Sequence, residues 1–115
     1  MTFKNLPEVA AAMHAFAEER DWGRFHTPKN LAAAMSVEAA EVLEHFQWLT
    51  DEEAKALPAD KREAVALELA DVFLYLVRLS DRLGVDLLEA SKRKMALNAL
   101  KYPADFTRGQ IRKKP

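Results

Sequence analysis

The sequence contains no cysteine, and its 115 residues include only three glycines and five prolines. Without cysteine, neither a disulfide framework nor a thiolate zinc site can form, as is usual for proteins of the reducing cytosol. The formal net charge is −1, so no overall field attracts nucleic acid. No apolar run of 18 residues occurs, and the N-terminus lacks a signal-peptide pattern. We therefore expect a cytoplasmic protein that binds neither nucleic acid nor a membrane.

The residues that are present are typical of a compact helical protein. Half of them are hydrophobic and 30% are charged, which argues against disorder. A chain of 115 residues corresponds to one domain by the usual size of domains. We expect a single domain over residues 1–115, with a core at about 5–103 and a C-terminal tail at 104–115.

Helix start and stop signals divide the chain. Polar residues that can cap a helix N-terminus recur, several of them followed three residues later by Glu. The pairs are Asn5 with Glu8, Thr27 with Pro28, Thr50 with Glu53, Asp60 with Glu63, and Asp86 with Glu89. They predict helices over 5–22, 27–50, 60–83 and 86–101, with a short connecting helix between residues 50 and 57. Long helices joined by short connections favour an all-α four-helix bundle.

The predicted helix at 60–83 is apolar on almost every side. Nine apolar side chains distribute around it at 100° per residue. They are Val65, Leu67, Leu69, Val72, Phe73, Leu74, Leu76, Val77 and Leu79. A helix of this kind is usually buried all round, which a lone 115-residue bundle can hardly achieve. We therefore expect a homo-oligomer.

Two pairs of acidic residues stand at helical spacing. Glu38 and Glu41 border the apolar face of the helix at 27–50, and His45 and Trp48 continue their stripe. Glu68 and Asp71 repeat the three-residue spacing in the apolar helix, where Tyr75 and Arg78 continue the stripe. A bundle that sets these helices side by side brings four carboxylates into one volume.

Four carboxylates in one volume call for compensation of their charge. Two like charges about 5 Å apart repel by about 3 kcal/mol at an effective dielectric constant of 20. A bound cation must compensate for them, or some of the carboxyls must be protonated. Oxygen ligands without cysteine suit a hard cation such as Mg²⁺ or Mn²⁺. The alternative is that each pair is an ordinary solvated helix face.

Cationic and aromatic side chains could complete a phosphate site. Lys94, Asn98 and Lys101 share one face of the helix at 86–101, where they could grip an extended anion or simply face solvent. The aromatic residues near helix ends could sandwich a nucleobase or fill the core. They are Trp22, Phe25, His26 and Trp48, with His14 upstream. Hydrolysis of a phosphoanhydride requires a metal ion and cationic side chains that neutralise the phosphate charge while water attacks.

Three segments together resemble a known family. They are ERDWGRFHTPKNLAAAMSVEAAEVLEHFQW, ELADVFLYL and KMALNALKYP, within residues 8–103. The chain resembles the all-α nucleoside triphosphate pyrophosphatases of the MazG-like superfamily, and most closely their dCTP pyrophosphatase branch. The short acidic motif alone is weak, but the flanking FHTPKNL, FQW and KYP segments make the resemblance specific.

The resemblance implies hydrolysis of a nucleoside triphosphate to the monophosphate and pyrophosphate, as a means of cleansing the nucleotide pool. Catalytic Mg²⁺ would be held by Glu38, Glu41, Glu68 and Asp71. Phosphate or sugar contacts would come from Tyr75, Lys94, Asn98 and Lys101, and the base pocket from His14, Trp22 and Trp48. Further substrate-binding candidates in the shared segments are His26, Lys29, Asn30 and Tyr102. Members of this family form dimers or dimer-of-dimers tetramers with pockets built by more than one protomer.

Two other classes are alternatives. A carboxylate-bridged di-iron oxidase or ferritin-like protein would need Glu three residues before His on two helices, a pattern that this sequence lacks. A non-catalytic helical adaptor would pack its apolar helix on a partner and leave the acids as a solvated rim. The pattern of residues also leaves open which base is preferred and which carboxylate would act as the general base.

Overall fold

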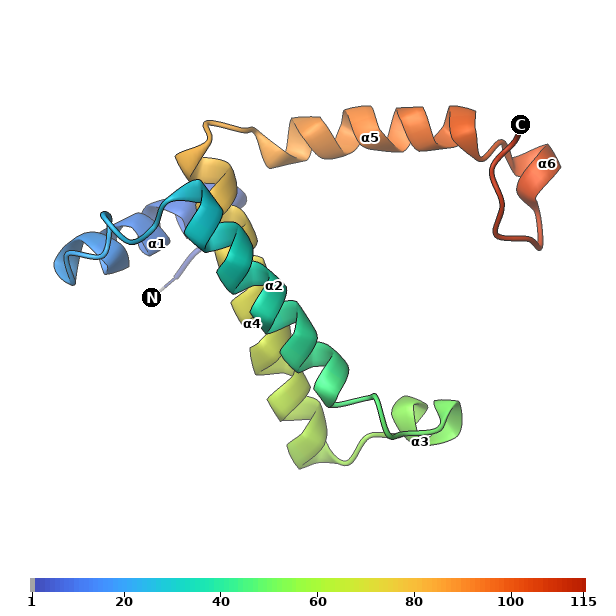
Figure 1. The fold of residues 1–115 in the computed structure, drawn as a ribbon, viewed down its shortest axis with the longest axis horizontal. Helices are drawn as coiled ribbons and strands as arrows, with labels where there is room; N and C mark the ends of the chain where they lie inside the picture. Colours follow the sequence, from blue (N-terminus) through green and yellow to red (C-terminus); the bar gives the residue numbers. More distant parts are fainter. Residues whose placement is uncertain (1) are drawn as a thin grey trace. The chain divides into compact units, whose positions relative to one another are not determined.

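The computed structural model describes residues 2–115, so residue 1 of the expected domain lies outside the described residues. The described chain is helical and has no strand, which confirms the all-α prediction. Its helices are α1 (Leu6–Glu19), α2 (Pro28–Glu44), α3 (Asp51–Lys55), α4 (Ala59–Arg82), α5 (Leu87–Lys101) and α6 (Ala104–Thr107) (Figure 1). Between residues 2 and 115, no helix is both long enough and apolar enough to cross a bilayer.

The chain folds as two compact units, one up to Gly84 and one comprising Val85–Pro115. In the first unit, α2 and α4 lie side by side and run antiparallel, and α1 packs against α4 (Figure 1). The short α3 lies in the connection between α2 and α4. This antiparallel pair is the part of the expected bundle that places the two acidic motifs next to each other.

Most helix starts follow the predicted caps. The side chains of Asn5, Thr27, Thr50 and Asp86 each accept a hydrogen bond from the backbone N–H three residues later. These bonds satisfy N–H groups that have no partner inside the helix. The predicted cap at Asp60 is wrong: α4 begins one residue earlier at Ala59, after Pro58, and no side chain caps it. Pro58 already has the extended backbone that precedes a helix.

The first helix ends at Glu19, earlier than the expected end near Trp22. Asp21 takes a left-handed backbone with φ of 53°, and the chain reverses there. The N–H of Asp21 donates to the Glu18 carbonyl, and that of Trp22 donates to the Ala17 carbonyl. These two bonds form a Schellman motif. Trp22 is thereby folded back against its own helix.

The second helix ends at Glu44, although the apolar pattern predicts helix to about Thr50. The N–H groups of Phe46 and Gln47 both donate to the Leu43 carbonyl, and that of Leu49 donates to the Phe46 carbonyl. The last turns are therefore tight turns rather than α-helix. Trp48 therefore lies beyond the end of the helix that carries Glu38 and Glu41, and it is exposed.

The second unit contains α5 and α6. The helix α5 ends at Lys101, as predicted. The α6 turn was not predicted, since it falls in the expected tail. The tail also folds back, because the N–H of Lys114 donates to the Lys101 carbonyl over 2.9 Å.

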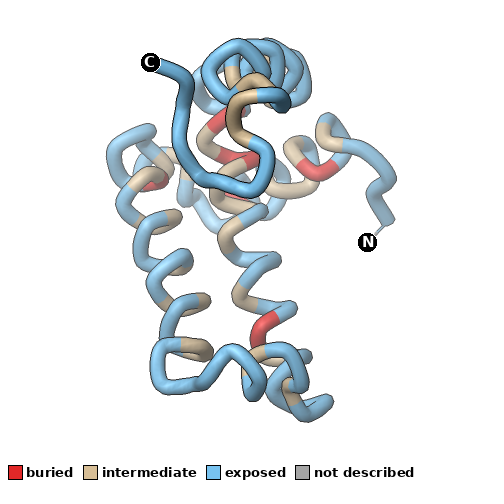
Figure 2. Tube along the Cα trace, turned by 90° about the vertical axis from the view of Figure 1, so that its right-hand side faces the viewer, coloured by how far each residue is buried: buried red, intermediate tan, exposed pale blue. Residues whose placement is uncertain are grey.

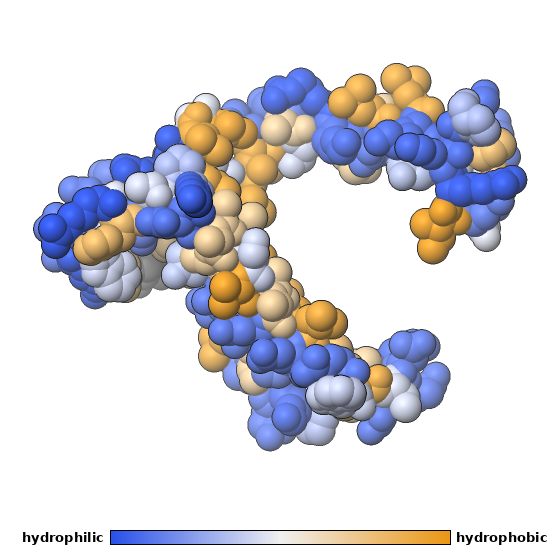
Figure 3. Space-filling view, in the orientation of Figure 1, coloured by the Kyte–Doolittle hydropathy of each residue, from blue (hydrophilic) through white to orange (hydrophobic). Residues whose placement is uncertain are grey.

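Burial is concentrated at a few positions of the first unit (Figure 2). The buried hydrophobic residues of the described chain are Val9, Ala17, Leu31, Val65 and Val77. Many large apolar side chains are exposed instead, and they colour parts of α2, α4 and α5 in Figure 3. On α4 they include Leu67, Leu69 and Phe73, and on α5 Met95, Leu97 and Leu100. The exposed apolar residues of α4 belong to the helix that the sequence predicts to be covered in an assembly.

Candidate active site

The antiparallel pair α2 and α4 brings three of the four predicted acids together. One carboxylate oxygen from each of Glu38, Glu41 and Glu68 lies within 4.8 Å of the others. The three-residue spacing of Glu38 and Glu41 puts both on one face of α2, and Glu68 comes from the adjacent face of α4. Asp71 is not part of this close group, but its charge acts on both Glu38 and Glu68.

The cluster is partly desolvated and incompletely hydrogen-bonded. One oxygen of Glu38 and one of Glu68, Oε2 in each case, are buried without a hydrogen-bond partner. Hydrogen bonding with Glu41, loss of hydration, and the charges of Glu41 and Asp71 raise the pKa of Glu38 to about 7. Burial is the main cause that raises the pKa of Glu68, and Glu41 adds to it. The protein alone therefore disfavours full ionisation of the cluster.

These residues fit a hard divalent cation. Buried carboxylate oxygens without donors are uncommon, since buried polar atoms normally have partners. A cation placed among Glu38, Glu41 and Glu68 would supply the missing partner and offset the repulsion that raises their pKa values. The all-oxygen donor set suits Mg²⁺ or Mn²⁺ and is unlike the nitrogen and sulfur sites of zinc.

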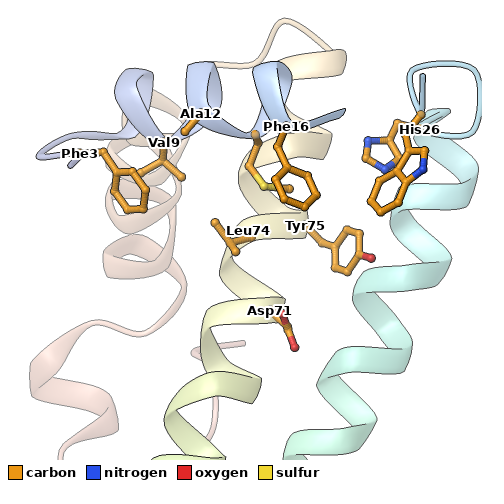
Figure 4. A pocket seen from close by; sticks show the side chains of 10 residues that line it. Phe3, Val9, Ala12, Phe16, His26, Asp71, Leu74 and Tyr75 are labelled. Carbon is orange, nitrogen blue, oxygen red and sulfur yellow. The ribbon is translucent and has the colours of Figure 1, made fainter. Parts of the chain in front are cut away.

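A cavity of about 330 Å³ lies beside the acids, between α1 and α4. Its wall is mostly apolar and includes Phe3, Val9, Ala12, Met13, Phe16, Trp22 and Leu74. The polar residues of its lining are His26, Asp71 and Tyr75, and the last two project from α4 (Figure 4). An apolar cleft of this volume with few polar groups is typical of a small-molecule site. Asp71 thus belongs to the cavity wall as well as to the electrostatics of the acidic cluster.

The Schellman motif at the end of α1 builds one wall of this cavity. It folds Trp22 back so that its ring meets Phe16 edge-on, with ring centroids 5.7 Å apart. The centroid of the His26 ring lies 6.1 Å from that of the Trp22 ring. Phe16 was not among the site residues predicted from the sequence. Its place in the cavity wall follows from its contact with Trp22. That contact forms only because the chain reverses at Asp21, after the end of α1.

Two arginines of α4 hold the loop that carries His26. Arg82 donates from Nε to the His26 carbonyl and from Nη2 to the Gly23 carbonyl, each over 3.1 Å. Arg78 donates from Nε to Nδ1 of His26 over 3.1 Å. At the start of α2, the Asn30 side-chain amide donates to the Phe25 carbonyl over 3.0 Å. Asn30 therefore supports the loop, and its predicted contact with substrate stays a prediction.

The other predicted substrate contacts lie in several places. His14 does not line the cavity but contacts Arg78. Lys29 is exposed in the first turn of α2. Trp48 is 87% exposed beyond the C-terminal end of α2, whereas Trp22 precedes the N-terminal end, so one chain does not bring the two indoles together. His45 lines a separate open hollow with Leu49, Glu52, Glu53, Ala56, Leu57, Pro58 and Lys61.

The predicted cationic face lies in the second unit. Lys94, Asn98 and Lys101 follow one side of α5, where both lysines are exposed. Tyr102 caps α5 and donates its N–H to the Asn98 carbonyl over 2.7 Å. The approach of these residues to the acidic cluster stays a prediction.

Comparison with known proteins gives consistent results. The chain is 46% identical to dCTP pyrophosphatase 1 of Mus musculus over 100 residues, and 47% identical to dCTP pyrophosphatase 1 of Homo sapiens over 104 residues. These alignments cover 84% and 88% of this chain but 59% and 61% of the relatives, so the chain spans about three fifths of their length.

A solved structure is similar over nearly its full length. The crystal structure of a pyrophosphatase from Archaeoglobus fulgidus superimposes with a TM-score of 0.81 at 38% sequence identity. The match covers 90% of this chain and 96% of that chain. Residues 33–113, which include all four predicted acids, match the MazG-like family. The chain therefore belongs to the MazG-like family.

Proposed function

We propose that this protein hydrolyses a nucleoside triphosphate, dCTP or a modified dCTP, to the monophosphate and pyrophosphate. The observation that carries the proposal is the convergence of Glu38, Glu41 and Glu68 within 4.8 Å, with two buried oxygens that have no partner. The names of the relatives, dCTP pyrophosphatase 1 at 46% and 47% identity, support the choice of substrate. Such an enzyme would cleanse the nucleotide pool of the cytoplasm.

Mg²⁺, or Mn²⁺ in its place, would be held by Glu38, Glu41 and Glu68, with Asp71 as the fourth acid. When bound, the metal supplies Lewis-acid neutralisation of phosphate charge. The carboxylates alone would repel the polyphosphate. Activity should therefore be lost on chelation of the metal.

The protein's own groups would position the substrate and move one proton. The oxygen of a water molecule forms a bond to the α-phosphorus while the bond from that phosphorus to the bridging oxygen breaks. A carboxylate such as Glu41 accepts the proton of the water, and pyrophosphate leaves with the bridging oxygen. Lys94 and Lys101 would offset the charge on the departing pyrophosphate, with Asn98 beside them on α5. Tyr75 would meet the sugar, and Trp22 and His26 the base.

We propose a four-helix bundle for each protomer, formed by α1, α2, α4 and α5, and a homo-oligomer, either a dimer or a dimer-of-dimers tetramer. The apolar side chains exposed on α4 and α5 support this proposal. So does the separation of Trp22 from Trp48 at opposite ends of α2. A second copy could bring its Trp48 to a cavity that the first copy lines with Trp22.

The function is tested by incubating purified protein with dCTP and Mg²⁺ and separating the products. The proposal requires monophosphate and pyrophosphate in equal amounts. Monophosphate with two free phosphates, or no turnover, would contradict it. A parallel screen of the common and modified deoxynucleoside triphosphates decides whether dCTP is preferred. The alternative is a pyrophosphatase with another substrate or a broad set of them.

A non-catalytic adaptor is separated from the enzyme by its response to metal. A ligand that binds the folded state raises the midpoint of thermal unfolding by mass action. We expect millimolar Mg²⁺ to raise the midpoint of this protein. An adaptor with a solvated acidic rim would unfold at the same temperature with and without Mg²⁺.

A further inference from the structure

A buried arginine joins two histidines next to the cavity. The side chain of Arg78 is fully buried at 0% exposure. Its Nε donates to Nδ1 of His26, and its Nη1 lies 3.1 Å from Nδ1 of His14. Its Nη2 is buried without a partner, and its Nη1 lies 3.8 Å from the carboxylate of the exposed Asp81. Sequence analysis placed Arg78 on the stripe of the acids without a role.

The chemistry of the guanidinium decides the state of both histidines. Arginine has five N–H donors, no acceptor, and stays protonated in proteins. A histidine nitrogen that receives a bond from arginine must therefore present its lone pair. Because Nδ1 is the accepting atom in His14 and in His26, each neutral ring carries its proton on Nε2.

This state gives the cavity a fixed hydrogen-bond donor. His26 is one of three polar residues among the ten that line it. Its Nδ1 is occupied by Arg78, and among residues 2–115 no hydrogen bond to its Nε2 is found. The ring lies 6.1 Å from that of Trp22 by their centroids and is bonded to Arg78, in the wall seen at the right of Figure 4. The free Nε2–H can therefore serve a bound ligand.

The cost of burying Arg78 points beyond a packing role. A buried charge without full hydrogen bonding is destabilising relative to an apolar side chain of similar volume. The charged groups near it are Arg82 and Asp81 on α4 and Glu18 on α1. Arg82 repels it, and neither carboxylate lies within hydrogen-bonding distance of its unpartnered Nη2. Burial together with Arg78 and Arg82 also lowers the pKa of His26, which keeps that ring neutral.

We propose that Arg78 is a positioning residue that locks His26 as an Nε2–H donor, so that the cavity selects a heterocycle with an acceptor atom facing His26. A carbonyl oxygen or an unprotonated ring nitrogen provides such an acceptor. That the heterocycle is the base of a nucleoside triphosphate rests on the proposed function. The lock itself is a property of the free protein and does not depend on that function.

The lock is tested by nitrogen-15 NMR of the histidine rings in the free protein. His26 should be a neutral Nε2–H tautomer at neutral pH. In Arg78→Met, His26 should lose this single tautomer and give the averaged shifts of an exchanging ring. His45, which lies beyond the far end of α2, should not change and serves as the internal reference. A wild-type His26 with its proton on Nδ1 would overturn the proposal whether or not the protein is an enzyme.

The consequence for selection is tested by kinetics with dCTP and with an analogue triphosphate whose base lacks the carbonyl acceptor. One neutral hydrogen bond corresponds to about a three- to tenfold difference in KM. Wild type should show this preference for dCTP, and Arg78→Met should lose it with little change in kcat. Arg78→Lys, which can still donate to one histidine, should restore part of the preference.

Arg82→Met is the matched control, because Arg82 holds the same loop only through carbonyl oxygens. It should lower the midpoint of unfolding but keep the preference for dCTP. If Arg82→Met removed the preference as fully as Arg78→Met, loop anchoring rather than the lock would be responsible, and the proposal would be overturned. If wild type hydrolysed no triphosphate, the proposed function would fail and the NMR result alone would decide on the lock.

Discussion

A substitution at Glu68 should change the stability and the activity of this protein in opposite directions. Its buried oxygen has no partner, and its charge opposes those of Glu41 and Asp71. We expect Glu68→Gln to raise the unfolding midpoint of metal-free protein, because one repelling charge is removed. The same change should lower pyrophosphohydrolase activity by about 100-fold or more and abolish the rise in midpoint with Mg²⁺. Thermal unfolding with and without metal, beside product analysis, measures all three effects.

Glu44→Gln is the control for that change. Glu44 lies on α2 as well, but it is exposed and outside the acidic cluster. It should leave the activity and the response to Mg²⁺ unchanged. A Glu68→Gln protein that kept wild-type activity would remove the acidic cluster from the proposed mechanism.

The raised pKa of Glu38 predicts how the stability of the metal-free protein depends on pH. Its pKa is raised from 4.5 to about 7 in the folded state, so the folded state binds a proton that the unfolded state has lost. The resulting stabilisation is complete below pH 4.5 and is lost as the pH rises through about 7. We therefore expect the unfolding midpoint to fall over this interval and Mg²⁺ to oppose the fall.

His26 contributes in the opposite direction, because its lowered pKa destabilises the fold as the pH drops below about 6.5. The contribution of Glu38 is therefore measured as the difference between wild type and Glu38→Gln at each pH. Wild type should be about as stable as Glu38→Gln below pH 4.5, where Glu38 is protonated, and should become steadily less stable than the variant as the pH rises to about 7. A constant difference would mean that Glu38 does not titrate in this range.

For single residues, the shared helix faces of the acids were predictable from the sequence, whereas the contacts of Arg78 were not. The spacing of Glu38 with Glu41, and of Glu68 with Asp71, follows from the local helical period. The contacts of Arg78 depend on a loop and a helix more than 50 residues away in sequence, at separations of 52 and 64. No periodic pattern within α4 contains that information.

The end of α1 is the helix terminus with the most consequence for the site. Asp21 adopts φ of 53° there, a conformation that costs an ordinary L-residue about 1–2 kcal/mol and glycine nothing. Its ion pair with Arg24, at 3.7 Å, is exposed and contributes little. We expect Asp21→Gly to stabilise the fold by up to about 1 kcal/mol, visible as a rise of about 3–5 °C in the unfolding midpoint.

Gly84 gives the complementary test. It has φ of 67° and open space around the position of a Cβ, so Gly84→Ala adds backbone strain without a steric clash. It should destabilise by about 1 kcal/mol. If Asp21→Gly and Gly84→Ala moved the midpoint in the same direction, left-handed strain would not explain either change.

Helix starts were easier to predict than helix ends for a physical reason. A start is set by one polar side chain bonding to an N–H three residues away, as at Thr27 and Asp86. An end depends on where the chain must turn to pack. The apolar pattern runs on through Phe46 and Leu49, although the helix has stopped at Glu44 and tight turns follow it.

For the molecule as a whole, the exposed apolar faces predict association. Leu69 is 53% exposed on α4 in the single chain. If an interface between copies covers this position, a lysine there would be buried, which is costly. We expect wild type to sediment as a dimer or tetramer and Leu69→Lys to shift toward monomer. Glu63→Lys, also exposed on α4, should keep the wild-type mass. A monomeric wild type with an unchanged cavity and full activity would contradict the proposed assembly.

The predicted all-α fold is confirmed, whereas the predicted bundle is only partly visible in a single chain. The pairing of α2 with α4 follows from their short connection through α3. The place of α5 cannot be read from its own pattern, because Met95, Leu97 and Leu100 are exposed within its unit and would suit either the same chain or a second copy. Which surface covers these apolar residues depends on the whole assembly and not on the sequence of one helix.

The two tryptophans give this protein a built-in optical readout. Trp22 sits against Phe16 and His26 in the cavity wall, whereas Trp48 projects into solvent beyond the other end of α2. In an isolated chain, iodide should therefore quench the fluorescence of Trp48 more strongly than that of Trp22. Single Trp→Phe variants would then report separately on the two ends of α2. Nucleotide binding should alter the emission of Trp22, and self-association that covers Trp48 should protect it from iodide as the concentration rises.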